Sequence, residues 1–147
     1  MSTAGADQGG GYEKPLPSVT TLTKPFWDSC AKHELRMQFC RDCNEWIWYP
    51  KGFCPSCGKR SGIEWRQLSG RGKVYSFTII RQVIENSPAF NKDLPFAIGL
   101  IELEEGPRIY SNLSGAKPEE ISIDDPVTVY FDDVAPGVSL PKFKISR

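Results

Sequence analysis

Four of the five cysteines fall into two closely spaced pairs, and their type and spacing indicate metal chemistry. The pairs are Cys40-Arg-Asp-Cys43 and Cys54-Pro-Ser-Cys57, with ten residues between them. Each CxxC turn can present two thiolates to one ion, and two such turns supply a tetrahedral set at about 2.3 Å from a metal. Gly58 follows the second pair, where a permissive backbone lets the turn close. The spacing therefore predicts one metal site with Cys40, Cys43, Cys54 and Cys57 as ligands.

The chemistry of four thiolates narrows the choice of metal. A tetrahedral thiolate set favours zinc, and a single iron is the next alternative. Disulfides would need an oxidising compartment, and the sequence shows no export signal. A redox CxxC motif usually stands alone at the start of a helix, whereas here there are two. Because four protein ligands leave no open coordination position, we expect a structural zinc that takes no part in a reaction.

Catalysis by this chain alone is not indicated. His33 is the single histidine, so only His33 could serve as an imidazole base. Nothing in the sequence shows a nucleophile or a carboxylate that is paired with it. We therefore expect His33 to pack against its neighbours or to face solvent.

The residues before the cysteine pairs predict a tail and a helix. Residues 1–22 are rich in Gly, Ser, Thr and Pro, which predicts a flexible tail. Residues 23–38 predict a helix, with Thr23 as N-cap and Pro25 in its first turn. One face of that helix would carry Phe26, Cys30, His33 and Met37. We expect the Cys30 thiol, which lies outside the metal set, to be buried there.

From Gly70 onward the pattern changes to period two with many β-branched residues, which predicts strands. Five strands are expected, at 73–83, 96–103, 108–113, 127–131 and 140–145, with a short helix at 117–121. That arrangement favours a small barrel of the OB type, and a β-sandwich is the competing fold. The sequence thus predicts a mainly β chain, in which an N-terminal helix and rubredoxin-like zinc ribbon (23–69) precede a five-stranded OB-fold barrel (70–147).

Composition and charge restrict the classes of partner. Of the 147 residues, 39% are hydrophobic, which is enough for a core, and 18 basic residues balance 18 acidic ones. Zero net charge makes non-specific nucleic-acid binding less expected, although Tyr75, Phe77 and Tyr110 could stack on bases. No apolar run reaches the roughly 18 residues of a membrane span, and no secretory signal is seen, so a cytoplasmic location is expected.

Two further features have both a structural and a functional interpretation. Basic residues gather around and after the second cysteine pair, where they either form a solvated face or bind a phosphate-bearing ligand. The connection 84–95 is long for a compact domain, and such loops tend to be functional or mobile. Phe90, at its middle, either folds back on the core or docks on something outside.

Several motifs together resemble one family. They are PFW in the helix, Gln38 before CRDC, WYP, CPSCG, SGRGKVYSFTII, LPFAIGLIEL, DDPVTVYF and a closing LPKF. The combination resembles the acyl-CoA-associated zinc-ribbon/OB-fold family known as domain of unknown function 35, over about residues 24–145. The chain departs from the family pattern at His33-Glu34 and at Asp125, where family members usually have glycine. Neither departure touches a metal ligand, so only local turn geometry would differ.

The resemblance implies a role beside a catalytic partner. Family members are non-catalytic subunits or domains of thiolase-superfamily enzymes, and the chain is similar to the small subunit of thiolases that cleave aromatic acyl-CoA substrates such as benzoylsuccinyl-CoA. It would stabilise a thiolase-like subunit in a hetero-oligomer, whose large subunit carries the catalytic residues. Candidates for the CoA phosphates are Arg60, Arg66, Arg71 and Lys73, and candidates for the partner interface are Trp48 and Phe90. The alternative is a single-stranded nucleic-acid-binding module.

Overall fold

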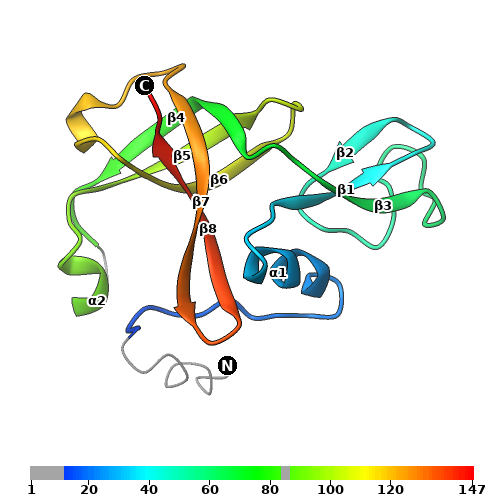
Figure 1. Cartoon of the computed structure of the whole chain (residues 1–147), viewed down its shortest axis with the longest axis horizontal. Helices are drawn as coiled ribbons and strands as arrows, with labels where there is room; N and C mark the ends of the chain where they lie inside the picture. Colours follow the sequence, from blue (N-terminus) through cyan, green and yellow to red (C-terminus); the bar gives the residue numbers. More distant parts are fainter. Residues whose placement is uncertain (1–11, 84–86) are drawn as a thin grey trace.

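A computed structural model describes residues 12–83 and 87–147. Within them a short helix and a three-stranded ribbon lie beside a closed five-stranded barrel (Figure 1). The predicted fold class is confirmed: a zinc-ribbon unit precedes an OB-type barrel. The first eleven residues of the predicted tail and positions 84–86 of the predicted loop lie outside the described residues.

The ribbon and the barrel follow one another along the chain. The first part comprises α1 (Lys24–Ala31), β1 (Arg36–Cys40), β2 (Glu45–Ile47) and β3 (Ile63–Gln67). The second comprises β4 (Arg71–Ile80), α2 (Pro88–Asn91), β5 (Phe96–Leu103), β6 (Arg108–Ser114), the 3-10 turn η2 (Pro118–Glu120), β7 (Pro126–Ala135) and β8 (Val138–Ile145). The ribbon order is β2-β1-β3 and the barrel order is β4-β5-β6-β8-β7. Only β6 and β8 pair in parallel among these strands.

The helix predicted over 23–38 is too long, because its second half forms a turn and strand β1. His33 has a positive φ of 61°, which a continuing helix does not allow. The chain closes the helix there, since the N–H groups of His33 and Glu34 bond to the carbonyls of Cys30 and Ser29. The predicted apolar face is still correct in part: Phe26, Cys30 and Met37 are all buried in one core.

The two departures from the family pattern have different local structures. At His33 the backbone takes the left-handed conformation that a glycine adopts freely. At the second departure the left-handed residue is Asp124, with φ of 70°, and Asp125 is not among the residues with positive φ. The Asp125 carboxylate instead accepts a hydrogen bond from the N–H of Ser122 at 2.9 Å. It therefore closes the turn into β7 with its side chain.

His33 also ties the end of α1 to the hairpin of β7 and β8. Its Nε2 lies 2.8 Å from Asp133 Oδ1, and its ring stacks on Phe131 with centroids 5.4 Å apart. The Ser139 hydroxyl donates to the same carboxylate. These hydrogen bonds, that of Ser139 first and that of His33 second, lower the pKa of the Asp133 carboxyl below its ordinary value.

Acid should remove this contact. A lowered folded-state pKa means that the stabilisation is present above the ordinary carboxyl pKa of about 4 and is lost as pH falls through the folded-state value. Asp133→Asn lacks the carboxylate at every pH. We expect its melting temperature to lie below that of the wild type at neutral pH, with the difference shrinking between about pH 5 and pH 2. Differential scanning calorimetry across that range measures the difference, and a constant gap would contradict the assignment.

The barrel strands keep the predicted order, with shifted ends. The first runs over Arg71–Ile80 rather than to residue 83, and the predicted helix at 117–121 is the single turn η2. The predicted loop 84–95 contains the short helix α2, whose Pro88 stands in its first turn.

Two glycines explain why the SGRGK motif stands where the first barrel strand, β4, begins. Gly70 has φ of 82°, and a Cβ there would meet the Val129 side chain. A Cβ on Gly72 would meet the carbonyl oxygen of Glu102 on the neighbouring strand β5. Both positions therefore need glycine so that β4 can enter the sheet.

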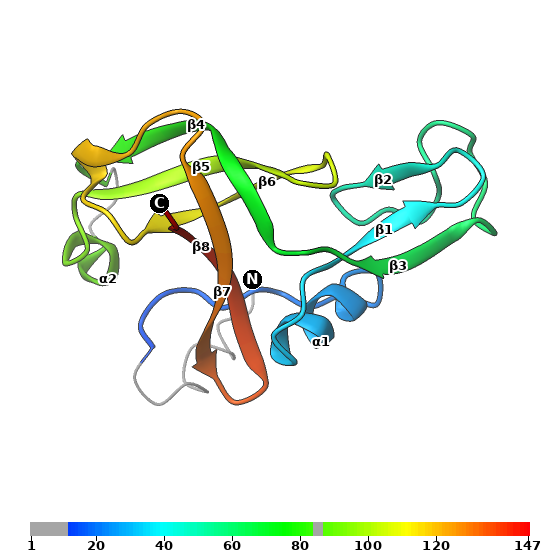
Figure 2. The ribbon, with the colours of Figure 1, turned by 45° about the horizontal axis from the view of Figure 1, so that its top comes forward.

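One core joins the base of the ribbon to the barrel. Phe26 and Cys30 of α1, with Leu35 and Met37, pack into the same cluster as barrel residues such as Phe143. The chain passes from β3 to β4 within three residues, and α1 lies beside that junction (Figure 2). A second, small cluster of Cys40, Ile47 and Cys54 lies at the metal end of the ribbon. The ribbon base is therefore continuous with the barrel, whereas its tip has a core of its own.

Candidate functional site

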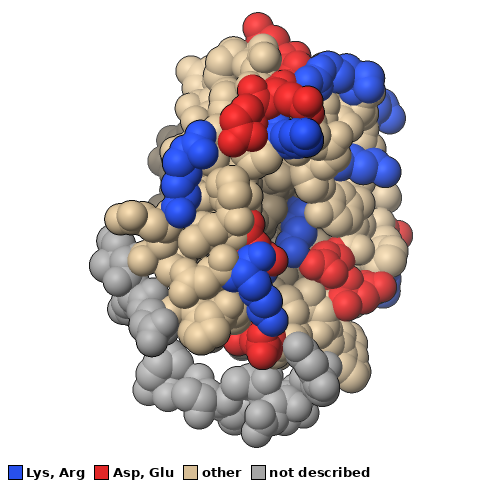
Figure 3. All heavy atoms as spheres, turned by 90° about the vertical axis from the view of Figure 1, so that its left-hand side faces the viewer, with Lys and Arg blue, Asp and Glu red and all other residues tan. Residues whose placement is uncertain are grey.

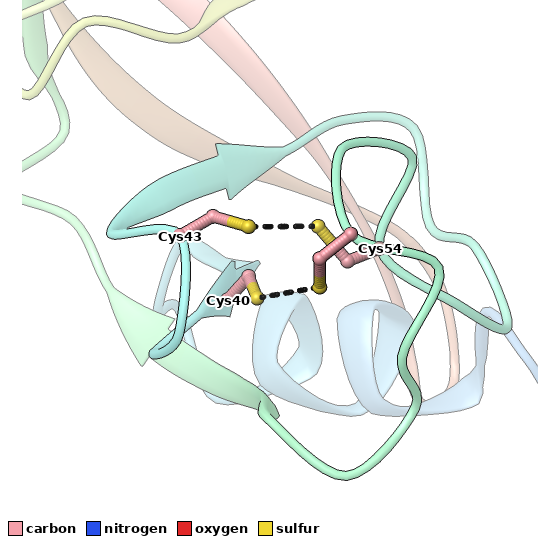
Figure 4. A group of neighbouring side chains, drawn as sticks. Cys40, Cys43 and Cys54 are labelled. Atoms are coloured by element: carbon pink, nitrogen blue, oxygen red, sulfur yellow. Dashed lines mark hydrogen bonds between the residues drawn. The ribbon is translucent and has the colours of Figure 1, made fainter.

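The structure brings the four predicted metal ligands together at the tip of the ribbon. All four sulfur atoms lie within 4.8 Å of one another. Cys40 Sγ is 3.9 Å from Cys57 Sγ, and Cys43 Sγ is 3.8 Å from Cys54 Sγ (Figure 4). A tetrahedron with metal–sulfur bonds of about 2.3 Å has edges of about 3.8 Å. Two of the sulfur–sulfur distances match that edge and the others do not exceed 4.8 Å, so the four residues fit one tetrahedral ion.

We call each CxxC turn a knuckle. In both knuckles, the residue that follows the second cysteine has a positive φ. Asn44 follows the first CxxC pair with φ of 57°, and Gly58 follows the second with φ of 75°. Glycine adopts this left-handed conformation freely, and asparagine tolerates it better than most residues. The N–H of Gly58 bonds to the carbonyl of Cys54 at 2.7 Å, which closes the second knuckle. The residue after each pair thus turns the chain so that both thiols face inward.

Backbone N–H groups of the second knuckle also stabilise the thiolate form of Cys54. The N–H of Cys57 is directed at the Cys54 sulfur and lowers the pKa of that thiol to about 7, with a smaller contribution from the N–H of Ser56. Cys30 behaves oppositely, because burial raises the pKa of its thiol to about 12. Cys30 is fully buried in the main core, as predicted. The pKa of the Cys43 thiol, another of the four predicted ligands, is raised, first by its hydrogen bond to Cys57, so the lowered pKa is a property of Cys54 and not of the whole set.

Gln38 holds the segment between the knuckles. Its side-chain amide donates to the Lys51 carbonyl at 2.8 Å, and its side-chain oxygen accepts from the Lys51 N–H at 2.7 Å. Gln38 is itself only 4% exposed. This role is not evident from the cysteine spacing; its signal is a polar residue between Met37 and Phe39 in an otherwise apolar strand. Gln38 therefore fixes where the second knuckle starts.

The candidate phosphate-binding residues are spread over the ribbon and the barrel, and three of them are paired. Arg71 binds Glu104 through two hydrogen bonds of 2.9 and 3.0 Å, which holds the pKa of that carboxyl below its usual range. Arg66 pairs with Glu64, and Lys73 Nζ is 3.7 Å from Glu102. Within the described residues, Arg60 is exposed and makes no ion pair. Arg60 is thus the best placed of the four to receive a phosphate.

A groove lies where α1, the ribbon and the barrel meet. It encloses about 310 Å³, and aromatic and apolar side chains form most of its wall. Its lining includes Phe26, Trp27, Trp48, Tyr49, Pro50, Ile109, Tyr110, Leu140 and Pro141. The Trp48 ring lies 4.9 Å from that of Phe26, while Tyr49 is 53% exposed. The WYP segment thus directs its aromatics to the barrel and to solvent, away from the metal.

Phe90 lies elsewhere, at a second cavity of about 440 Å³ between residues 12–15, α2 and the barrel. Its ring centroid is 6.5 Å from that of Phe96, and the Lys14 ammonium lies 5.3 Å from the ring centre. Phe90 is therefore half-buried against the barrel. Figure 3 shows this end of the molecule, where basic and acidic side chains are interspersed around a hollow. Trp48 and Phe90 do not line a common site.

Comparison with known proteins gives the family. The ChsH2 rubredoxin-like zinc ribbon domain matches residues 27–62, and the ChsH2 C-terminal OB-fold domain matches residues 65–132. Benzoylsuccinyl-CoA thiolase subunit BbsA of Thauera aromatica is 33% identical over 114 residues, which are 74% of this chain and 72% of that subunit. A chain of the Ltp2-ChsH2(DUF35) aldolase superposes with a TM-score of 0.78 at 29% identity, covering 88% of this chain and 98% of that one. The chain belongs to the DUF35 family.

Some relatives are larger than this chain. The probable enoyl-CoA hydratase alpha subunit of Thermomonospora curvata is 32% identical over 134 residues, but the chain spans only 40% of its length. The shared part is therefore the ribbon–barrel unit. Among the described residues, none of the helices is long and apolar enough to span a bilayer.

Proposed function

We propose that this DUF35 chain is the non-catalytic zinc-binding subunit of a thiolase-superfamily complex that processes an acyl-CoA. The observation that carries the proposal is the match over almost the whole chain to the DUF35 component of an aldolase, together with the likeness to a thiolase subunit. The site chemistry agrees with it. Four thiolates complete the coordination of a tetrahedral zinc, so such an ion would act on structure and not on substrate.

The environment of the single histidine also supports a non-catalytic role for this chain. The His33 side chain is 52% exposed, hydrogen-bonded to Asp133 and stacked on Phe131, so it forms a surface contact between the end of α1 and the β7–β8 hairpin. The catalytic groups would then belong to the partner, which this chain would stabilise. The zinc would order the ribbon, and the ribbon would hold the WYP segment against α1 and the barrel.

The test is a purification of the tagged chain from its own organism, followed by mass spectrometry of what accompanies it. We expect a thiolase-superfamily subunit in a fixed ratio and about one zinc per copy of this chain. The isolated chain should show no thiolysis or aldol cleavage of acyl-CoA. Turnover by the isolated chain, free of any thiolase, would contradict the proposal.

We further expect Arg60 to contribute to binding of the CoA phosphates, because it is the candidate without a carboxylate partner. In the assembled complex, Arg60→Ala should raise the apparent KM for acyl-CoA several-fold while kcat changes little. Arg71→Ala is the matched control, since Glu104 already neutralises that guanidinium. Steady-state kinetics of both variants measure the difference. An equal KM in Arg60→Ala and the wild type would show that this part of the ribbon does not bind CoA.

Nucleic-acid binding is the rival function. Tyr75 and Tyr110 are exposed on the barrel, as base-stacking residues would be. However, the Arg108 guanidinium already covers the Tyr75 ring at 3.7 Å, and Glu102 pairs with Arg108 at 3.0 Å. Micromolar binding of single-stranded DNA with a steep salt dependence would favour the rival.

A further inference from the structure

Strand β5 is apolar on both of its faces. Ala97, Ile101 and Leu103 point into the barrel and are buried. The alternating residues Ile98 and Leu100 face outward and remain partly exposed. When one face of an antiparallel sheet is exposed to water, that face normally carries polar side chains. The pattern of β5 is instead typical of a strand that is covered on both sides.

The neighbouring strands extend this apolar area. Leu100 pairs with Ser76 of β4 and with Tyr110 of β6, and Tyr110 is 62% exposed. Together these residues line a shallow hollow of about 140 Å³. We call this area the outer sheet face; its members are Ser76, Thr78, Ile98, Leu100 and Tyr110.

The helices of the described chain pack elsewhere. Helix α1 packs against β1, β7 and β8. Helix α2 reaches the barrel through Phe90, which contacts Phe96 at the far end of β5. In Figures 1 and 2, β4 and β5 lie on the side of the barrel away from α1, while β6 also borders the groove beside α1. The outer sheet face is therefore open to a partner.

Tyr110 connects the outer sheet face to the groove between ribbon and barrel, because it lines both. Trp48 and Tyr49 bring the ribbon to this groove, and Phe26 brings α1. A protein bound across the two areas would contact the ribbon, the helix and the barrel at once. Such a continuous aromatic and aliphatic area is a common feature of protein interfaces.

The charges at the rim favour an apolar occupant. Glu102 lies 3.0 Å from Arg108 and 3.7 Å from Lys73, and Lys73 also lies 3.7 Å from Asp124, so two cations and two carboxylates neutralise one another. Because the rim has no net positive charge, it would not attract a polyanion. An uncharged protein surface could bind there with little desolvation of charged groups. Residues 1–11, MSTAGADQGGG, contain a single large apolar side chain, Met1, which is too little to cover an area formed by five residues on three strands. The occupant is therefore another chain.

We propose that the outer sheet face and the groove dock an apolar patch of the thiolase-type catalytic subunit. The inference rests on the proposed function, which supplies the class of partner. A second copy of this chain is less favoured, because one relative matched over most of its length is a thiolase subunit and another is a chain of the Ltp2-ChsH2(DUF35) aldolase.

The test replaces Leu100 by glutamate. The side chain faces outward, so the free chain should fold, and circular dichroism with metal analysis checks this. Against the purified catalytic subunit, isothermal titration should show a dissociation constant at least about 100-fold higher than that of the wild type, because a carboxylate would be buried unpaired. Tyr110→Ala should weaken binding about 10-fold or more.

Val19→Glu is the matched control. Val19 is also an exposed apolar residue, 51% accessible, but it lies in the segment before α1 and lines neither the groove nor the hollow of the outer sheet face. It should bind like the wild type within about three-fold. Wild-type affinity in both Leu100→Glu and Tyr110→Ala would overturn the docking surface while leaving the proposed function intact. Failure of the wild-type chain itself to bind any thiolase-type subunit would overturn the function. A wild-type homodimer that Leu100→Glu dissociates would show that the face pairs with a second copy.

Discussion

Replacing Cys54 with serine should remove the metal and unfold the tip of the ribbon while the barrel stays folded. Among the described residues, the tip is held by the small core of Cys40, Ile47 and Cys54, with Cys43 and Ile63 packed against it, and by whatever ion the four thiols bind. Zinc binding in such units supplies about 10–16 kcal/mol of apparent free energy, so without it the tip has too little apolar burial to remain ordered. The base of the ribbon shares the main core and should survive. Elemental analysis gives the metal content, and limited proteolysis between β1 and β3 reports the local unfolding.

Cys30→Ser is the control for this prediction. Cys30 is also a fully buried thiol, but it lies in the main core and outside the metal set. The variant should lose some stability and keep its full metal content. A Cys54→Ser protein that retains one equivalent of tightly bound metal would show that the cluster is not the ligand set. Iron in place of zinc would leave the set correct and change only the ion.

Phe143→Ala should lower the free energy of unfolding of the barrel by about 3–5 kcal/mol. Phe143 has no exposed surface and is the largest fully buried side chain. It pairs with Leu113 of β6 on one side and with Val129 of β7 on the other. Its loss would leave a cavity at the seam where β8 closes the barrel. Urea denaturation followed by tryptophan fluorescence, with zinc present throughout, measures the change.

Phe143→Leu tests whether volume is the cause. It keeps most of the buried apolar area and should cost clearly less, about 1–2 kcal/mol. The neighbouring Lys142 pairs with Asp132 at 2.6 Å, so its replacement would disturb charge without opening the core. Equal losses for the alanine and leucine variants would mean that strand pairing, and not packing, depends on residue 143.

The metal ligands could be predicted from sequence because their information is local. Two CxxC pairs are short turns, and each places its thiols without help from distant residues. The barrel was also predictable, since its strands show clear period-two patterns and the parallel pairing of β6 with β8 follows from closing five strands. The LPKF motif at the end is explained by this closure: Phe143 fills the core, while Leu140 and Pro141 face the groove.

The remaining features depend on contacts between distant residues. The predicted helix runs too far because a histidine occupies the left-handed position that ends it, and apolar spacing alone does not reveal that position. The groove could not be predicted, since its wall combines Phe26, Trp48 and Pro141 from three separate segments. The ion pair of Arg71 with Glu104 likewise arises only when β4 and β5 form a sheet, whereas Arg66 pairs with Glu64 two residues away on the same strand. A count of basic residues therefore exaggerates the charge that is free to bind phosphate.

The core shared by α1 and the last strand has a consequence for the order of folding. Phe26 and Cys30 pack in the same cluster as Phe143 and Ile145, more than one hundred positions later. Contacts that are so far apart in sequence form slowly, because a long loop must close first. While the ribosome is still making the barrel, the CxxC turns can already close, but the apolar face of α1 is covered only in part, by β1 and Trp48. The newborn chain is then most exposed to aggregation until β8 emerges, and a partner or chaperone that shields α1 would raise its yield.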